Sequence, residues 1–314
     1  MQIIQEIKDI NSNIKRGIAL GNFDGIHIGH QKLINSLLNL CSINKIEPCI
    51  YTFANHTLPI ISKTKSIKYI TSIDMKQKIF REMGISELIL NKFDSSLMSL
   101  SPEEFIKNIL VEKLNCKVAV VGFDYHFGYK AEGNVGLLKK LGQKYDFEVV
   151  VIDPVMIDDE IVSSSYIRTY LKEGNIKKVN KYLGRYFSLY STVIHGDARG
   201  GDLLGFPTAN ISLDTLQLLP KPGVYATLIK INNEFYMGAT SVGNKPTFEG
   251  KEQSVETFIL DFTGDLYDKD IEVIFVEFIR DEYKFKSPEA LTEQIKKDVE
   301  TIKNTLQDKY NMLR

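Results

Sequence analysis

Residues Gly21–His30 read GNFDGIHIGH and place two histidines and three glycines where a strand is expected to run into a helix. The apolar segment Ile18–Leu20 comes directly before them, and Gln31–Cys41 has apolar residues at helical spacing directly after. A helix start leaves backbone N–H groups unpaired at the positive end of the helix dipole, so it attracts anions. The glycines let a phosphate approach the backbone, and the imidazoles supply donors near neutral pH. The stretch therefore predicts a phosphate site on a strand–turn–helix unit.

Two other interpretations of His27 and His30 are open. One histidine could cap the helix while the other packs in the core, which is the ordinary role of a single histidine at such a place. Alternatively the pair could bind zinc, but the sequence offers no third and fourth ligand in a recognisable pattern. Two histidines together in a glycine-rich turn favour phosphate chemistry over both alternatives.

The overall composition is that of an ordinary globular protein with two domains. The 314 residues are 43% hydrophobic and 25% charged, which is enough apolar material for two cores. With 39 basic and 40 acidic residues, the net charge of −1 argues against a general nucleic-acid binder, which needs a basic surface. No apolar run is long enough to cross a bilayer, and the N-terminus has no signal-peptide pattern. Cys41, Cys49 and Cys116 lack metal-ligand spacing, so we expect reduced, buried thiols in a cytoplasmic protein.

The first half of the chain alternates short apolar runs with helix-like segments. Strands are expected at Ile18–Leu20, Cys49–Phe53, Leu88–Leu90, Val118–Val121 and Glu148–Ile152, and helices at Gln31–Cys41, Ile73–Met83 and Ile167–Leu183. Ser101, Pro102 and Glu104 form a capping-box pattern that predicts one more helix. This alternation predicts an α/β fold, a Rossmann-like parallel sheet covered by helices, over residues 1–184.

The second half of the chain is rich in strand-like runs separated by turn signals. These runs include Leu189–His195, Gly223–Ile231, Phe235–Val242, Thr257–Phe262 and Ile271–Phe278. The pattern is typical of a compact antiparallel β-barrel. A final helix begins at Ser287 and Pro288 and carries an apolar stripe that ends at Leu306. We therefore expect a second domain, residues 185–314, made of a barrel and a terminal helix.

Three motifs in the first half, taken in order, resemble one protein family. His27-Ile28-Gly29-His30 looks like the HxGH signature of nucleotidyltransferases, Val121–Gly128 resembles a GxDFxFG segment, and Val162–Arg168 resembles an SSTxIR motif. The ordered set is similar to the adenylyltransferase domain of the prokaryotic bifunctional riboflavin kinase/FAD synthetases. The resemblance implies a nucleotidyltransferase domain that adenylylates FMN to FAD and releases pyrophosphate.

The same resemblance implies a role for each matching residue. It makes His27 and His30 catalytic residues at the α-phosphorus of ATP. It makes Ser164 and Arg168 ligands of the β and γ phosphates, and an arginine fork suits phosphate oxygens. Binding of ATP and its phosphates is further implied for Gly21, Asn22, Phe23, Asp24 and Gly29, with Asn22 and Asp24 shaping the turn. The flavin side is implied to consist of His56, Phe123, Asp124 and Phe127.

Two segments depart from the family pattern on this flavin side. The family's TFEPHP-like segment is here Thr52–Thr57, in which His56 matches but Ala54 replaces the usual glutamate and both prolines are missing. His126 stands where the family usually has arginine. These changes motivate an alternative, a kinase whose adenylyltransferase domain is weak or inactive.

The second half holds its own candidate site in the glycine-rich stretch Gly196–Asn210, which ends in GFPTAN. Glycines in a connecting loop favour close approach of a ligand to the backbone. If the end of the stretch is extended, Thr208 and Asn210 point the same way, and their oxygens suit Mg²⁺ bound with nucleotide phosphates. An ordinary barrel loop with glycine turns is the alternative.

GFPTAN is strongly similar to the riboflavin kinase signature of the same family. Further segments that fit are Pro222–Ala226, Asn244–Phe248, Val255–Phe262 and Asp265–Tyr267, whereas Gly201 stands where the family often has a basic residue. The resemblance implies that Thr208 and Asn210 are the metal ligands for Mg-ATP and that Glu256 is the general base. It also implies ATP or flavin contacts for Gly200, Gly205, Pro207, Tyr225, Asn244 and Arg280.

Glu256 precedes an apolar run, so we expect it at a strand end, where it can accept the proton of the 5′-hydroxyl of riboflavin. A solvated charge on an edge strand is the other interpretation of this residue.

The combined expectation is one chain with two ATP-dependent activities. The second domain phosphorylates riboflavin to FMN and the first converts FMN to FAD, both with Mg²⁺ and with ATP as co-substrate. The expected partners are riboflavin, FMN, FAD and ATP, with no nucleic acid and no membrane. The alternatives are the kinase with an impaired first domain, a non-catalytic flavin- or nucleotide-binding regulator, and an adenylyltransferase for another phosphate ester. The last of these has no use for GFPTAN and the glutamate.

Overall fold

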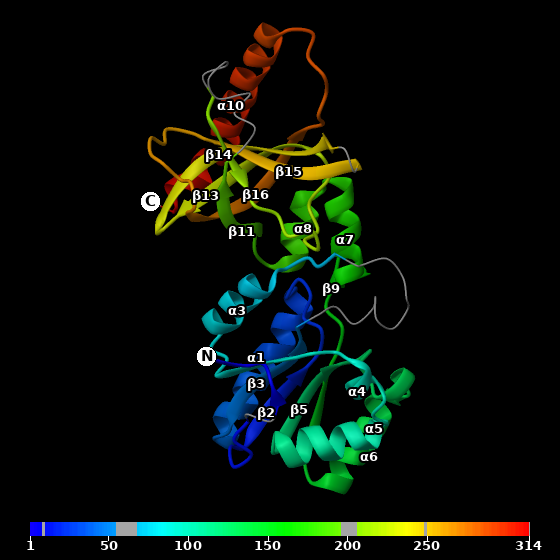
Figure 1. Ribbon diagram of the computed structural model, residues 1–314. Helices are drawn as coiled ribbons and strands as arrows, with labels where there is room; N and C mark the ends of the chain where they lie inside the picture. The colour runs from blue at the N-terminus through cyan, green and yellow to red at the C-terminus, as the bar shows by residue number, and fades with distance from the viewer. Residues whose placement is uncertain (8–9, 55–67, 196–205, 248–249, 314) are drawn as a thin grey trace. The chain divides into compact units, whose positions relative to one another are not determined.

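The computed structural model describes residues 1–7, 10–54, 68–195, 206–247 and 250–313, drawn as ribbon in Figure 1. By their internal contacts these residues form two compact units, Met1–Ser164 and Ser165–Arg314. Each unit is described by itself below.

The first unit is built on a six-stranded parallel sheet. Its strands are β1 (Gln2–Ile4), β2 (Arg16–Leu20), β3 (Glu47–Phe53), β4 (Glu87–Asn91), β5 (Cys116–Gly122) and β8 (Glu148–Ile152), in the order β1-β4-β3-β2-β5-β8. Every neighbouring pair is parallel. The α/β fold with a parallel sheet is thus confirmed.

Helices cover both faces of this sheet. Their bounds are α1 (Ile28–Asn44), α3 (Ile73–Glu82), α4 (Ser95–Met98), α5 (Pro102–Glu104), η2 (Phe105–Lys113) and α6 (Val135–Tyr145). Three short elements precede α6: β6 (His126–Phe127), η3 (Tyr129–Ala131) and β7 (Gly133–Asn134). Two short strands follow β8: β9 (Met156–Ile157) and β10 (Glu160–Ile161). Ala19 packs in the core under α1 and α3, while Ile18 and Leu20 pack in the core under η2 and α6. Strand β2 is therefore buried on both faces, which explains its unbroken apolar sequence.

The helix boundaries follow from local caps. Ser72 caps α3, and Gly84 follows its end with a φ of 92°, as the sequence predicts. Ser101 and Glu104 form the predicted capping box, with both reciprocal hydrogen bonds present. The helix that they start continues as the π-helix η2, which the sequence did not indicate.

The strand order places the two turns of interest side by side. From β2 the chain moves to β3 and then β4 on one side, and it returns to β5 on the other side of β2. In open parallel sheets, ligands bind outside the carboxyl ends of the strands at such a reversal. The turn that follows Leu20 and the turn that follows Gly122 both lie there.

At the opposite end of the sheet, Arg16 of β2 and Glu87 of β4 form a fully buried ion pair. The guanidinium also donates to the carbonyls of Asn11, Ile14 and Leu114. Because all these acceptors converge on one side chain, Arg16 fixes the segment that leads into β2.

The second unit contains a closed antiparallel barrel. Its strands are β11 (Phe187–Ile194), β12 (Thr208–Ile211), β13 (Gly223–Ile231), β14 (Glu234–Thr247), β15 (Gly250–Ile259) and β16 (Asp270–Arg280), in the closed order β11-β12-β15-β14-β13-β16. Helix α10 (Pro288–Asn311) is capped by Ser287 and packs Ile302 and Leu306 against the outer face of the barrel. The predicted barrel with a terminal helix is confirmed.

Three fully buried threonines are linked inside the barrel. The Thr227 hydroxyl donates to the Gly238 carbonyl at 3.0 Å, and the Thr240 hydroxyl lies 2.7 Å from that of Thr227 and 2.8 Å from that of Thr257. Because a hydroxyl has one hydrogen, Thr240 donates to Thr227 and Thr257 donates to Thr240. The row crosses β13, β14 and β15 and satisfies every hydroxyl in it.

The expected single helix over Ile167–Leu183 is wrong. The structure has α7 (Ser164–Glu173) and α8 (Ile176–Leu183), which are separated by Gly174 with a φ of 78° and by the cap residue Asn175. A left-handed glycine ends a helix, so the periodic pattern continues across a real break. Both helices belong mainly to the second unit by their contacts, and the domain limits of 1–184 and 185–314 stay a prediction.

Candidate active sites

The signature turn between β2 and α1 has an unusual backbone. Phe23, Gly25 and Ile26 have φ values of 47°, 86° and 42°, all in the left-handed region. This region costs free energy for a residue with a side chain, most of all for a β-branched one such as Ile26. Phe23 and Ile26 are 1% and 0% exposed, so their burial in the core under α1 and α3 offsets that cost.

His27 and His30 lie face to face at the start of α1. Their rings stack with centroids 3.7 Å apart, and the Nδ1 atom of His27 accepts a hydrogen bond from the backbone N–H of His30 at 3.4 Å. His27 is therefore the N-cap of α1, and in its neutral form the proton resides on Nε2. A Cβ atom on Gly29 would lie 3.1 Å from the His27 ring, so this glycine makes room for the stack. The capping interpretation holds for His27, and the cap sits at the anion-attracting end of the helix.

Polar groups of the turn are bonded to backbone and side-chain groups that surround it. The Asp24 carboxylate accepts hydrogen bonds from the N–H groups of Ile70 and Thr71 at 2.9 and 3.3 Å. The Asp24 carbonyl accepts from the Ser164 hydroxyl at 2.8 Å. The Asn22 carbonyl also accepts side-chain hydrogen bonds, which are taken up below. In this structure Asp24 and Ser164 thus hold the shape of the turn, whereas their contacts with phosphates stay a prediction.

The predicted flavin residues divide into exposed and buried ones. Phe123 and Asp124 are exposed just beyond the carboxyl end of β5, Phe123 at 45%. Phe127 is buried and stacks on Tyr125 with ring centroids 5.6 Å apart. His126, at the departure from the family pattern, is exposed and bonded through Nδ1 to the Asp124 carbonyl at 2.8 Å. Phe127 therefore supports the fold beneath the turn, while Phe123 offers its ring to the surface.

Other predicted site residues lie on α7, on β14 or outside the described residues. Arg168 lies half-buried on α7. His56, Gly200 and Gly205 lie outside the described residues, and for Asn244 only its backbone position in β14 is described. Their binding roles stay predictions.

The kinase candidates form a row across neighbouring strands of the barrel. Asn210 of β12 lies directly opposite Glu256 of β15, and Glu256 lies opposite Ser241 of β14. Residues directly opposite one another share a face of the sheet, and so do Thr208 and Asn210, which are two positions apart in the same strand. Thr208, Asn210 and Glu256 are therefore all on one face, as the extended interpretation of GFPTAN requires.

The expectation that Glu256 sits at a strand end is wrong. Strand β15 begins at Gly250 and ends at Ile259, so Glu256 lies within it. The polar residues before Glu256 extend the strand because they pair with the long strand β14. Val255 and Thr257 are 1% and 0% exposed and point into the barrel, so the alternation turns Glu256 outward.

A second carboxylate, which the sequence did not reveal, lies beside this row. A Cβ atom on Gly243 would lie 2.6 Å from Oε1 of Glu282, and the Ser241 hydroxyl donates to the same carboxylate. Partial desolvation raises the pKa of Glu282, with Arg280 opposing and Glu256 adding to the rise. Glu282 follows β16 and comes near Glu256 through Ser241 and Gly243 of β14, so no local motif could have found it.

Two residues predicted to contact ATP or flavin form hydrogen bonds within the protein instead. Tyr225 is fully buried, and its hydroxyl donates to the Lys221 carbonyl. Arg280 directs Nε and Nη2 at the Asp298 carboxylate of α10 and Nη1 at the Asp281 carbonyl. Pro207, by contrast, is exposed just before β12. The side chains of Tyr225 and Arg280 therefore secure the barrel, and a ligand contact by either stays a prediction.

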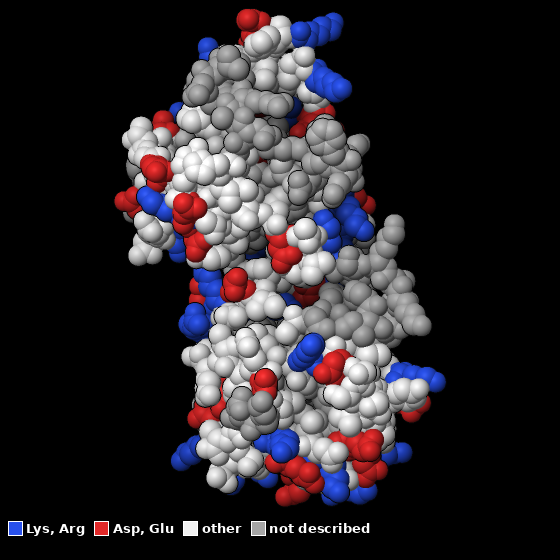
Figure 2. All heavy atoms as spheres, in the orientation of Figure 1, with Lys and Arg blue, Asp and Glu red and all other residues white. Residues whose placement is uncertain are grey.

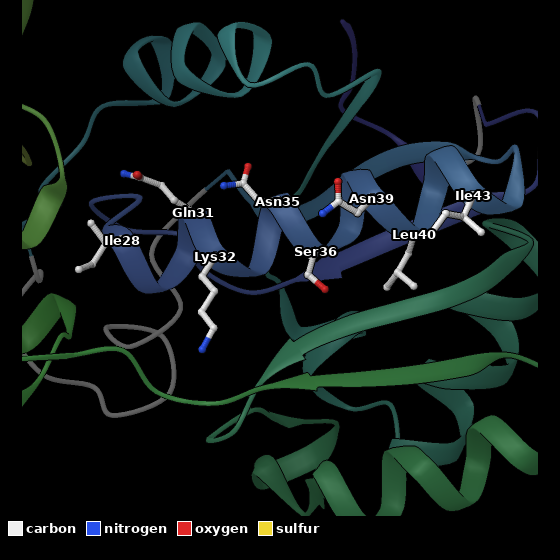
Figure 3. A pocket seen from close by; sticks show the side chains of 8 residues that line it. All are labelled: Ile28, Gln31, Lys32, Asn35, Ser36, Asn39, Leu40 and Ile43. Carbon is white, nitrogen blue, oxygen red and sulfur yellow. The ribbon is translucent and has the colours of Figure 1, made fainter.

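Other surface features add no chemistry to these two places. A shallow hollow runs along one face of α1 and is lined by Ile28, Gln31, Lys32, Asn35, Ser36, Asn39, Leu40 and Ile43 (Figure 3). It leads away from the signature turn, and Ile43 at its far end is 77% exposed. On the face drawn in Figure 2, acidic and basic side chains are interspersed over both units. Within the described ranges, no helix is long and apolar enough to cross a membrane, and no three His, Cys, Asp or Glu side chains are grouped to hold a metal.

Comparison with known families assigns both halves of the chain. The family model described as FAD synthetase matches residues 9–166, and the one described as riboflavin kinase matches residues 183–306. A solved structure from Streptococcus pneumoniae, which carries the name macrolide-efflux protein, has a TM-score of 0.86 and 33% identity and covers 96% of this chain and 98% of its own. It shares the fold, and its name describes that protein alone.

Similar proteins of known function span the chain almost completely. Bifunctional riboflavin kinase/FMN adenylyltransferase from Buchnera aphidicola (subsp. Schizaphis graminum) is 40% identical over 96% of both chains. The protein of the same name from Bacillus subtilis is 35% identical, and the match covers 90% of both chains. The one from Escherichia coli K12 is 31% identical, and the match covers 95% of this chain and 96% of that protein. The chain therefore belongs to the family of bifunctional riboflavin kinase/FMN adenylyltransferases.

Proposed function

We propose that this chain makes FAD from riboflavin in two ATP-dependent steps. One site transfers the γ-phosphoryl group of ATP to the 5′-hydroxyl of riboflavin and yields FMN and ADP. The other joins FMN to the adenylyl group of ATP and releases pyrophosphate. The observation that carries the kinase step is the placement of Asn210 opposite Glu256 on one face of the barrel. The observation that supports the adenylyl step is the stacked histidine pair at the start of α1, which lies where the strand order of the sheet reverses.

Glu256 is the proposed general base of the kinase step. A primary alcohol is a poor nucleophile at neutral pH, and a carboxylate that accepts its proton makes transfer of the phosphoryl group possible. Glu256 faces outward and is only partly buried, so a bound alcohol can reach it. Asn210 on the neighbouring strand supports the assignment, because both side chains share one face.

Thr208 and Asn210 fit a magnesium ion that accompanies ATP. Both side chains offer neutral oxygens from one face of β12, and hard oxygen donors of this kind suit Mg²⁺. When bound, the metal neutralises charge on the nucleotide phosphates. The protein's own part is to present the two oxygens in a strand whose register to Glu256 is fixed.

In the adenylyl step the protein brings two anions together and stabilises charge without a covalent intermediate. His27 and His30 are the proposed donors at the α-phosphate, assisted by the positive end of the helix dipole at the start of α1. On the family's motif, Ser164 and Arg168 are the proposed ligands of the β and γ phosphates. Phe123, exposed beyond β5, is the proposed apolar surface for the flavin ring.

We also propose that the enzyme works in the cytoplasm. Cys41, Cys49 and Cys116 are all free and buried, which suits a reducing compartment.

A kinase with an impaired first domain is the second candidate function. Ala54 and His126 replace residues that are usual in the family, and both are exposed near carboxyl ends of the sheet strands. The deciding experiment incubates the chain with riboflavin, ATP and Mg²⁺ and separates the flavins by chromatography. FMN followed by FAD supports both activities, FMN alone leaves the kinase only, and no product favours a regulator that binds without turnover.

A further inference from the structure

The conformation of the signature turn has to be held from outside. Phe23 and Ile26 have positive φ values although neither is glycine. Such conformations persist only where the surroundings over-determine them. The contacts that reach the turn from other elements therefore decide how accurately His27 and His30 are placed.

One of these contacts is a buried ammonium group. Lys76 lies in α3, is only 8% exposed, and donates from Nζ to the Asn22 carbonyl at 2.9 Å. The same carbonyl accepts from the Thr52 hydroxyl of β3 at 3.2 Å. Asn22 directly precedes Phe23, so Lys76 and Thr52 anchor the turn at the residue where its left-handed path begins.

The neighbouring contacts tie the same two elements together. The Asp24 carboxylate binds the N–H groups of Ile70 and Thr71, which lie just ahead of α3. The turn and the start of α3 are thus joined in both directions, by a carboxylate from the turn and an ammonium from the helix. Placing a lysine in the protein interior costs free energy, and it is tolerated where its hydrogen bonds are strong.

We propose that Lys76 is a positioning residue of the adenylyltransferase site. By holding the Asn22 carbonyl, its ammonium keeps the turn in the path that sets His27 and His30 at the head of α1. It also places a positive charge behind a turn whose ligand is a polyphosphate, in a poorly screened environment. This inference rests on the adenylyltransferase activity proposed above.

The test compares Lys76→Met, Lys76→Arg and the matched control Lys78→Met. Lys78 lies on the same helix, two positions on, and so faces another direction. FAD formation is measured from supplied FMN while ATP is varied, and FMN formation from riboflavin is measured in the same preparations. Thermal unfolding gives the folded fraction of each variant.

We expect Lys76→Met to lower kcat/KM for ATP in FAD formation about 100-fold, the scale of a roughly 1 Å misplacement of reacting groups. FMN formation should be unchanged, Lys76→Arg should restore at least a tenth of the lost activity, and Lys78→Met should match the unaltered chain. If Lys76→Met keeps its kcat/KM per folded molecule, or if Lys78→Met loses as much, the inference is overturned. If the unaltered chain makes no FAD, the proposed function fails instead.

Discussion

Arg280 at the end of β16 donates three hydrogen bonds to the Asp298 carboxylate of α10. Nε donates to each carboxylate oxygen at 3.0 Å, and Nη2 donates to Oδ2 at 2.7 Å. Asp298 is only 5% exposed and also accepts from Gln294. The contact fixes the terminal helix to the barrel, and it occupies a guanidinium that the family resemblance assigns to a ligand.

Arg280→Ala should therefore act on stability first. Removing one partner of a buried ion pair leaves an uncompensated charge, which costs about 3 kcal/mol. Denaturant unfolding measures this loss, and Lys177→Ala, which breaks the exposed pair with Glu277, should cost under about 1 kcal/mol. A rise in KM for ATP or riboflavin with unchanged stability would instead support the ligand role.

Glu256→Gln should abolish FMN formation while FAD formation from supplied FMN persists. Loss of a general base lowers the rate by about 10²- to 10⁴-fold, and the amide keeps the size of the side chain. Steady-state rates of both reactions on one preparation give the comparison. Glu277→Gln, in β16, a strand that does not pair with β15, should leave both rates intact. Loss of both activities in folded Glu256→Gln protein contradicts the separation of the sites.

His30→Ala should do the reverse and remove FAD formation alone. His30 stacks on His27 and packs edge-on against Phe23 with centroids 5.3 Å apart. The variant loses both a proposed phosphate donor and the support of the other ring, so we expect a loss of at least about 100-fold. Riboflavin phosphorylation in the same sample is the control, and a normal rate of FAD formation would remove His30 from the site.

Gly29→Ala tests the space under the His27 ring. The added methyl group would lie 3.1 Å from two ring atoms, so the imidazole has to move by a few tenths of an ångström. We expect FAD formation to fall about 10-fold, because catalysis depends steeply on the placement of reacting groups. Gly136→Ala, in the first turn of α6, is the matched change and should leave FAD formation as it was. Equal effects of the two substitutions would show that the ring position does not matter.

The buried thiols predict how stability changes at high pH. Burial raises the pKa of Cys41 to about 11 and that of Cys116 to about 12, from an ordinary value of 9.0. Between pH 9 and these values the unfolded chain loses thiol protons that the folded chain keeps, so the free energy of unfolding falls as pH rises. Denaturant unfolding from pH 8 to 11 measures the fall, which Cys41→Ala should reduce. An unchanged slope in that variant would contradict the shift for Cys41.

Elements with strong local signals were predicted well from the sequence. The apolar strands β2, β5 and β8 and the caps at Ser101 and Ser287 depend on neighbouring residues alone. The break at Gly174 was missed because the apolar spacing continues across it. Strand β12 carries no strand signal of its own and is extended because it pairs with β11 and β15.

The turn and the strand that carry the two candidate sites were also predictable, but their contacts with the rest of the fold were not. HxGH and GFPTAN mark the turn and the strand from a few adjacent residues. The hydrogen bond from Ser164 to Asp24 joins residues 140 positions apart, and that from Lys76 to Asn22 joins residues 54 positions apart. Spacing within a single sequence carries no information on such pairs. The part of Asp24 in shaping the turn was expected, but its backbone partners were not, and a ligand contact by Asp24 stays a prediction.

The threonine row inside the barrel constrains how this sequence can drift. The hydroxyls of Thr227, Thr240 and Thr257 are hydrogen-bonded to one another in a row. Exchanging one of these threonines for valine therefore leaves a neighbouring polar atom without its hydrogen-bond partner. Exchanging all three gives an apolar filling of nearly the same volume. We therefore expect substitutions at these three positions to occur together in evolution, although the positions lie in three different strands of the chain.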